Sequence, residues 1–266
     1  MSSAREIANL RSIPTNGNIL LDFTAGDALE SGGTCNIAAG LNALGAATTG
    51  DDNIALGRLA LGAGTLTGAA NIAMGISAGD ALTSGAENIA IGKEALSSAT
   101  TSGNNIAIGC RALFASVDDG ENNVAIGKGA MGATDVSGDH NIALGNDAAN
   151  AVTSGAFNIA LGLDAFGAGT TGSCNIAIGV TSLGAGTTTG CDNIALGRIS
   201  MDALTSGGCN IAIGLSALGA QTDGCNNIAI GKSALAASVN DADDNIAIGS
   251  TALGGADVSG ADNIAM

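Results

Sequence analysis

Apolar and polar positions alternate along this chain in one short motif that recurs every 17 or 18 residues. The motif is an asparagine, an aliphatic residue, an alanine, a further apolar residue and a glycine, numbered here from 0 to +4. Complete copies begin at Asn36, Asn53, Asn71, Asn88, Asn105, Asn123, Asn141, Asn158, Asn175, Asn193, Asn210, Asn227 and Asn245. A degenerate copy begins at Asn18, and a last one begins at Asn263. Self-similarity at such a period is typical of proteins built from stacked units.

Alternation within the motif predicts a short extended strand. Ile89 and Ile91 of one copy lie on one face of that strand, and Ala90 lies on the other. Gly92 then ends the strand at a corner that needs unusual backbone angles. We expect a second short strand at residues 95–96, an Ala-Leu pair, and at the equivalent pairs. Recurrent Gly, Asn and Thr and the lack of a helical apolar stripe argue against helices.

One coil, meaning the stretch from one motif asparagine to the next, buries too few aliphatic side chains to offset the entropy of ordering it. Coils stacked about 4.8 Å apart would pair every strand and make the apolar columns continuous. The sequence therefore predicts an all-β parallel β-solenoid, or β-roll, of about 14 coils of 17–18 residues. We expect the motif asparagines to form a structural ladder of stacked amides, each side chain bonding the next.

The loops carry a second, longer period of 122 residues. The sequence of residues 80–85, for example, is repeated at residues 202–207. We therefore expect two tandem seven-coil blocks. The predicted boundaries are an N-terminal cap or arm at 1–17, a first block at 18–140, a second block at 141–262, and the start of an uncapped further coil at 263–266.

Composition narrows the classes of partner. The chain has 43 Gly, four Phe and neither Trp nor Tyr, so aliphatic side chains must fill the core. A formal net charge of −16 argues against nucleic acid, because phosphate contacts need clustered Lys and Arg. No apolar run approaches the roughly 20 residues of a membrane span, so membrane insertion is not expected. Residues 1–20 contain no apolar signal segment, which leaves a cytoplasmic, viral or non-classically exported location open.

The six cysteines include no C-x-x-C pair, so a structural zinc site is not expected. Four of them occupy nearly the same loop position in consecutive coils: Cys174, Cys191, Cys209 and Cys225. Two interpretations stay open. These residues are either small, half-buried thiols or cross-links within or between chains, since stacking brings their Cα atoms near a disulfide separation.

We expect no catalytic, cofactor or metal site. His140 is the single histidine, and no Ser-His-Asp or Cys-His grouping can be built on it in both blocks. The carboxylate pairs Asp118/Asp119 and Asp243/Asp244 lie in glycine-rich loops. These carboxylates are either ordinary solvated loop residues or a weak Ca²⁺ site. The calcium-roll motif G-G-x-G-x-D, which would favour the Ca²⁺ site, is absent. The sequence therefore predicts a protein that is not an enzyme.

Two surface files, meaning rows of equivalent residues in successive coils, admit both a structural and a functional interpretation. Five of the eight basic residues directly follow the motif glycine: Arg58, Lys93, Lys128, Arg198 and Lys232. They either block unwanted sheet pairing or form a basic row that meets acidic loops of a neighbouring chain. A hydroxyl or carboxylate precedes the loop glycine in most coils, as at Thr49, Thr67 and Ser84. That file either serves turn chemistry or binds a regular lattice such as ice.

The motif with its following loop, as at residues 88–92, resembles the head repeats of YadA-like trimeric autotransporter adhesins, and related repeats look familiar from phage and viral fibre proteins. The resemblance covers about residues 18–266. It implies a left-handed parallel β-roll, three chains side by side, and adhesion through a large repetitive surface.

Assembly is also expected from the residues themselves. Alanine at +2, from Ala38 to Ala265, predicts a smooth, uncharged sheet face suited to packing against another chain. An unpaired strand edge at 263–266 favours end-to-end growth. The sequence thus predicts a non-catalytic structural or adhesive fibre protein whose partner is itself, as a homo-oligomer such as a trimer or as a filament, with a surface or lattice ligand as a further partner. The alternative is an ice- or mineral-binding solenoid with a Thr/Ser surface, and a carbohydrate-active β-helix enzyme comes third.

Overall fold

The computed structural model describes residues 16–22, 24–29, 32–116, 120–237, 242–255, 258 and 260–266. Most of the predicted arm at 1–17 lies outside these residues. The chain divides into two units, residues 1–136 and 137–266. The described part of each unit consists of short parallel strands joined by turns, without a helix. The predicted all-β parallel β-solenoid of about 14 coils is thereby confirmed, whereas the 122-residue duplication stays a prediction.

Strands β2 to β14 are formed by residues +1 to +3 of a motif, and the terminal strands β1 and β15 by residues +1 and +2. The first unit contains β1 (Ile19–Leu20), β2 (Ile37–Ala39), β3 (Ile54–Leu56), β4 (Ile72–Met74), β5 (Ile89–Ile91), β6 (Ile106–Ile108) and β7 (Val124–Ile126). The second unit contains β8 (Ile142–Leu144), β9 (Ile159–Leu161), β10 (Ile176–Ile178), β11 (Ile194–Leu196), β12 (Ile211–Ile213), β13 (Ile228–Ile230), β14 (Ile246–Ile248) and β15 (Ile264–Ala265).

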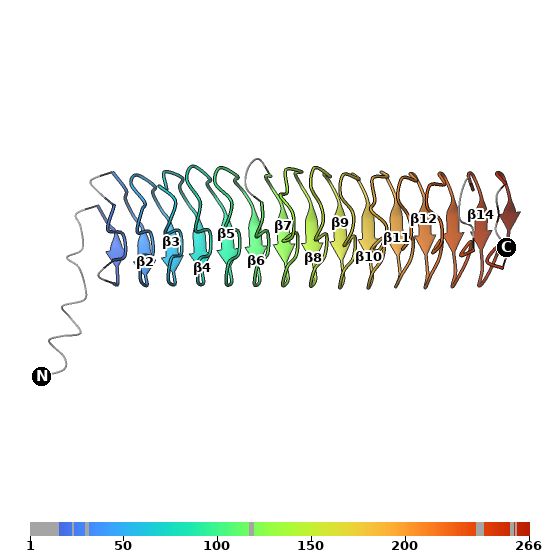
Figure 1. The fold of residues 1–266 in the computed structure, drawn as a ribbon, viewed down its shortest axis with the longest axis horizontal. Coiled ribbons are helices and arrows are strands. Elements are labelled where there is room, and N and C mark those ends of the chain that lie inside the picture. The colour runs from blue at the N-terminus through green and yellow to red at the C-terminus, as the bar shows by residue number, and fades with distance from the viewer. Residues whose placement is uncertain are drawn as a thin grey trace, which may run out of the picture. The chain divides into compact units, whose positions relative to one another are not determined.

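Within each unit the strands lie side by side in chain order (Figure 1). Neighbouring strands are parallel, and alanine lies opposite alanine. Ala90 pairs with Ala107 in the first unit, and Ala177 pairs with Ala195 in the second. The motif therefore sets both the position of each strand and its register against the next coil.

The motif alanines point into the solenoid. Ala90 and Ala177 are at most 1% exposed, whereas Met74 and Ile178 keep 40% and 39% of their surface. The alternation of faces is as predicted, but the expectation that alanine forms an exterior docking face is wrong. Position 0 shares a face with position +2, and the asparagine amide finds its partners inside the coil. The narrow interior beside it holds only a methyl group, so the larger aliphatic side chains face outward.

The Ala-Leu pair after each corner lies in a turn, and the predicted second strand is absent from the described residues. In one coil Glu94 and Leu96 have φ of 57° and 51°, with Ala95 between them. Left-handed residues at alternate positions cannot form an extended strand. The turn instead carries the leucine side chain into the core, and Leu96 N donates to Ala112 O of the next coil at 2.9 Å.

The corner glycine at +4 is required by backbone shape and by its neighbours. In the described coils its φ lies between 126° and 141°, which side chains other than hydrogen rarely tolerate. A Cβ on Gly92 would lie 2.6 Å from the carbonyl oxygen of Gly109, the equivalent glycine of the next coil. Close stacking of the coils therefore depends on this residue type.

Gly92→Ala is expected to lower the free energy of unfolding by about 2–4 kcal/mol, because it adds backbone strain to a clash with the next coil. Thermal and urea unfolding measure the loss. Gly255→Ala is the matched control, since a Cβ there meets nothing within 4 Å. Equal effects of the two substitutions would contradict the role assigned to the corner.

Candidate functional surface

The outward side chains of the strands form an uncovered apolar surface, which we call the aliphatic face. In the first unit it consists of residues +1 and +3 of β2 to β7, and in the second unit of the same positions of β8 to β14. Its most exposed members, at 37–40%, are Met74, Ile126, Ile142, Leu144, Ile178, Ile213 and Ile248. Parallel sheets are normally covered on both faces, and contiguous exposed apolar patches mark contact sites. The aliphatic face is therefore the strongest candidate for a functional surface.

Two columns of residues flank the strands. The leading column contains the residue directly before each motif asparagine, and the trailing column contains the residue directly after each motif glycine. Exposed aliphatic members of the trailing column are Leu41, Ile76, Leu163 and Val180. Its basic members are Arg58, Lys93, Lys128, Arg198 and Lys232, all exposed. The aliphatic face is thus bordered on one side by a column in which apolar and basic side chains predominate, and in the first unit the bases alternate with Leu41, Ile76 and Cys110.

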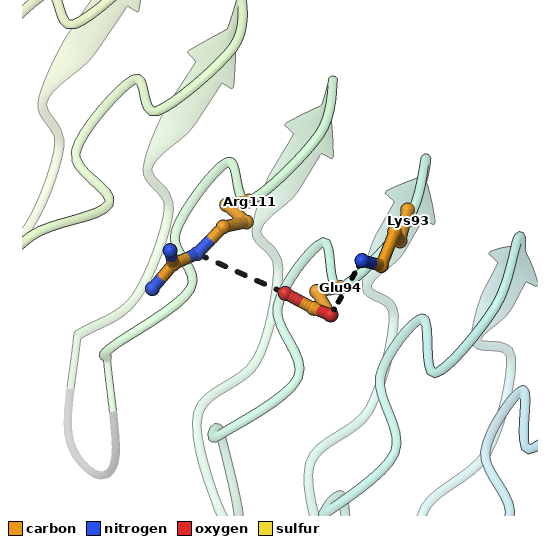
Figure 2. Close-up of polar contacts among 3 residues, drawn as sticks. All are labelled: Lys93, Glu94 and Arg111. Carbon is orange, nitrogen blue, oxygen red and sulfur yellow. Dashed lines mark ion pairs between the residues drawn. The ribbon is translucent and has the colours of Figure 1, made fainter.

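A small ionic network lies at the trailing column of the first unit, where coils after β5 and β6 meet (Figure 2). Glu94 Oε1 lies 3.2 Å from Lys93 Nζ, and Glu94 Oε2 lies 3.8 Å from Arg111 Nε. The Arg111 guanidinium also stacks 4.0 Å from the ring centroid of Phe114. Because Lys93 and Arg111 are 60% and 54% exposed, these ion pairs contribute little to stability.

The motif asparagines are buried and bond from coil to coil. Asn158 is representative: its backbone N and its Nδ2 both donate to Asn141 Oδ1 at 3.0 Å. Its Oδ1 in turn accepts from the backbone N and the Nδ2 of Asn175, at 3.0 and 3.2 Å. Nδ2 also donates to the loop carbonyl of Gly172 at 2.8 Å. Each amide therefore ties its own coil to the coils on either side.

The four clustered cysteines are free thiols. Cys174, Cys191 and Cys209 are exposed, and Cys225 is partly exposed. The interpretation as half-buried thiols is therefore wrong for the first three, because the loop positions just before the motif asparagine point outward. Cys191 Sγ lies 3.4 Å from the backbone N of Ser173, which donates to it. Cross-linking of these cysteines stays a prediction.

Hydroxyls of the predicted file bond to the protein itself. Thr67 Oγ1 donates to Thr83 O at 3.2 Å, and Thr189 Oγ1 donates to Thr205 O at 3.3 Å. Ser102 of the same file is buried instead of exposed. The two threonine hydroxyls join successive coils, whereas the buried Ser102 Oγ has no hydrogen-bond partner among the described residues. The file is therefore not uniform, which favours the interpretation as turn chemistry over a lattice-binding surface.

The remaining chemistry-bearing residues do not converge. His140 stacks on Phe157 with ring centroids 5.0 Å apart. Asp243 Oδ1 accepts from Cys225 N at 2.7 Å, which makes it a turn residue, while Asp118 and Asp119 lie outside the described residues. Over the ranges that the structure describes, no three His, Cys, Asp or Glu side chains are grouped to hold a metal ion. The same ranges contain no apolar helix of membrane-spanning length.

One carboxyl group of the second unit has a perturbed pKa. Partial burial raises the pKa of Asp164, and the negative charges of Asp147 and Asp202 raise it further. Asp147 and Asp164 occupy the same turn position in successive coils, so stacking aligns like charges. This arrangement opposes folding at neutral pH and offers no acid-base partner.

The aliphatic face differs from the docking face that the sequence predicts, which consists of the alanines at +2. Those alanines are buried in the structure. The signal was present in the motif: Asn, Ala and Gly at 0, +2 and +4 must share one face of the strand. Asparagine can form an amide ladder only where the next coil supplies its partner. Alanine consequently points inward with it, and the isoleucines point outward.

The fold and its surface define a repeat protein of the parallel β-solenoid class. Comparison with protein-family models, curated proteins and solved structures found no match for this chain.

Asn158→Ala is expected to cost about 2–5 kcal/mol, because it leaves the Asn175 amide groups and the Gly172 carbonyl without their buried partner. Chemical denaturation measures the effect. Asn263→Ala is the control, since Asn263 is only part-buried and its side chain bonds Asn245 alone among the motif asparagines. A loss at Asn158 no greater than at Asn263 would show that the ladder does not bind the coils together.

Asp164→Asn is expected to raise the melting temperature at pH 7, because it removes a charge whose pKa is raised in the folded state. The sign follows from linkage: a raised carboxyl pKa destabilises the fold above that pKa, and the penalty disappears as pH falls below the ordinary value of 3.8. Melting curves of both proteins should therefore converge near pH 3. Asp147→Asn, which relieves the same repulsion, should give a smaller shift of the same sign. A stabilisation that persists unchanged at pH 3 would contradict this origin.

Proposed function

We propose that this protein is a non-catalytic structural protein that self-associates through the aliphatic face and serves as a fibre or adhesive element. The observation that carries the proposal is the uncovered pair of aliphatic columns on a parallel sheet. Such a face loses unfavourable contact with water when a second apolar surface covers it. The resemblance of the motif to adhesin head repeats is consistent with this role.

The size of the face allows it to form a substantial part of a protein interface. Three residues of about 3.3 Å across six or seven strands about 4.8 Å apart give on the order of 300 Å² in each unit. The face of one unit therefore supplies somewhat less than half of the roughly 800 Å² that each partner contributes to a standard interface. Exposed members of the trailing column, such as Leu163 at 51%, enlarge the apolar area.

A second copy of the chain is the partner that fits this periodicity. The aliphatic face presents apolar side chains at the same two positions of every coil, mostly isoleucine or leucine, with alanine in register beneath them. A partner with an irregular surface would match this repeat at only a few coils. A second copy has the same spacing, so its side chains can interdigitate along the whole face.

The double substitution Ile178→Arg and Ile213→Arg is expected to raise the dissociation constant for self-association at least tenfold, because it buries cations in an apolar contact. Sedimentation equilibrium and light scattering across about 1–200 μM measure the change. The variant reduces the net negative charge of −16, so a loss of association cannot be attributed to greater repulsion.

Thr171→Arg with Ser206→Arg is the matched control, because both positions are exposed loop positions and add the same charge. Circular dichroism and melting curves establish that the variants remain folded. The proposal fails if the wild-type chain is monomeric at 200 μM, or if the variant at residues 178 and 213 associates as tightly as the control.

A further inference from the structure

The two columns that flank the aliphatic face are matched coil by coil. Three coils combine a leading carboxylate with a trailing base: Asp52 with Arg58, Glu87 with Lys93, and Asp192 with Arg198. Where the trailing residue is aliphatic, the leading residue is uncharged: Cys35 with Leu41, Ala70 with Ile76, Phe157 with Leu163, Cys174 with Val180, and Cys209 with Leu215. In three other coils only one of the two positions is charged, and the other holds an amide or a hydroxyl. These leading and trailing residues are Asn122 with Lys128, Asn226 with Lys232, and Asp244 with Ser250. No coil from Asn36 to Asn245 has like charges at both positions.

The members of a matched pair do not meet within one chain. A strand, its asparagine and its corner glycine separate them, which places the two columns more than about 10 Å apart at roughly 3.3 Å per extended residue. Asp52, Arg58, Asp192 and Arg198 are exposed, and none of them forms an ion pair among the described residues. Pairing inside the chain therefore does not account for the match at Asp52 and Arg58 or at Asp192 and Arg198, whereas Lys93 Nζ also lies 3.2 Å from Glu94 Oε1 of its own coil.

Neighbouring coils do not supply an opposite charge within a column either. In the trailing column of the first unit, Arg58 lies between Leu41 and Ile76. In that of the second unit, Arg198 lies between Val180 and Leu215. Each base is isolated in its own column, and so is the carboxylate of the same coil. Arg58 and Arg198 are thus free to pair with carboxylates from outside the chain, such as those of a second copy.

Symmetry determines which columns face each other when a second copy covers the aliphatic face. A twofold axis parallel to the stacking direction reverses the strands and keeps the order of the coils. It sets the leading column of one copy against the trailing column of the other, coil for coil. A twofold axis along the strands would set leading against leading and trailing against trailing, which opposes like columns. Sheets packed face to face lie about 10 Å apart, a gap that an arginine or lysine and a carboxylate span together.

We propose that equivalent units of two copies pack through their aliphatic faces in parallel and in coil register, each pair of units about a twofold axis along its own stacking direction. Asp52, Glu87 and Asp192 of each copy then pair with Arg58, Lys93 and Arg198 of the other. Phe157 packs against Leu163 of the other copy by the same rule. This inference rests on the proposed function and adds the orientation and the register of the contact.

Charge exchange tests the pairing. One variant carries Asp52→Arg, Glu87→Lys and Asp192→Arg, so both its columns are basic at these coils. A second carries Arg58→Asp, Lys93→Glu and Arg198→Asp, so both are acidic. Each variant alone is expected to self-associate at least tenfold more weakly than wild type, because like charges oppose each other at both edges. An equimolar mixture is expected to form a one-to-one heterodimer, detected by native mass spectrometry.

The variant with all six substitutions is the control for net charge, because it keeps −16 and restores opposite charges at every exchanged coil. We expect it to associate as wild type does. The pairing is overturned if wild type associates but the mixture yields no heterodimer, if the mixture yields trimers, or if either single-sign variant associates as tightly as wild type. A monomeric wild type would instead overturn the proposed function itself, and the pairing with it.

Discussion

The buried asparagine amide is the interaction on which the rest of this structure depends. The Oδ1 of a motif asparagine accepts from the backbone N of the next asparagine and in most coils also from its Nδ2, as Asn193 does from Asn210. The Nδ2 donates to the previous asparagine, to a loop carbonyl or to both, as that of Asn193 does to Asn175 and Gly207. A buried amide without these partners is costly, so coils can stack only with asparagine above asparagine. The ladder therefore fixes the register that aligns every other column.

The same ladder explains how coils of 17 and 18 residues alternate without disturbing the sheet. Asn36 donates to the carbonyl of Gly50, 14 residues on, whereas Asn53 donates to that of Gly68, 15 residues on. Both loop glycines precede the next asparagine by three residues. The extra residue is therefore taken up in the turn before the loop glycine. Strand, corner and ladder keep one geometry while the loops vary.

Because the register is constant, equivalent residues of successive coils form columns, and these columns determine which parts of the surface are apolar or charged. The interior columns, alanine at +2 and leucine in the turn, are buried and hold each unit together. The exterior columns at +1 and +3 are apolar but uncovered, while charged residues lie in the flanking columns, the turns and the loops. The proposed self-association accounts for this separation better than binding of a small ligand would, because the surface offers length and repetition instead of a concave site.

The sequence by itself determined the period, the strand, the corner glycine and the parallel stacking, because a motif repeated at nearly constant spacing admits few other folds. It also placed asparagine at the coil-to-coil contact. It did not determine the turn at Ala95 and Leu96, where left-handed residues replace an expected strand. Nor did local alternation show which face was interior, since isoleucine and alanine are both apolar. Only the closed coil decided that question: its interior has room for a methyl group beside the amide, and the isoleucines are left outside.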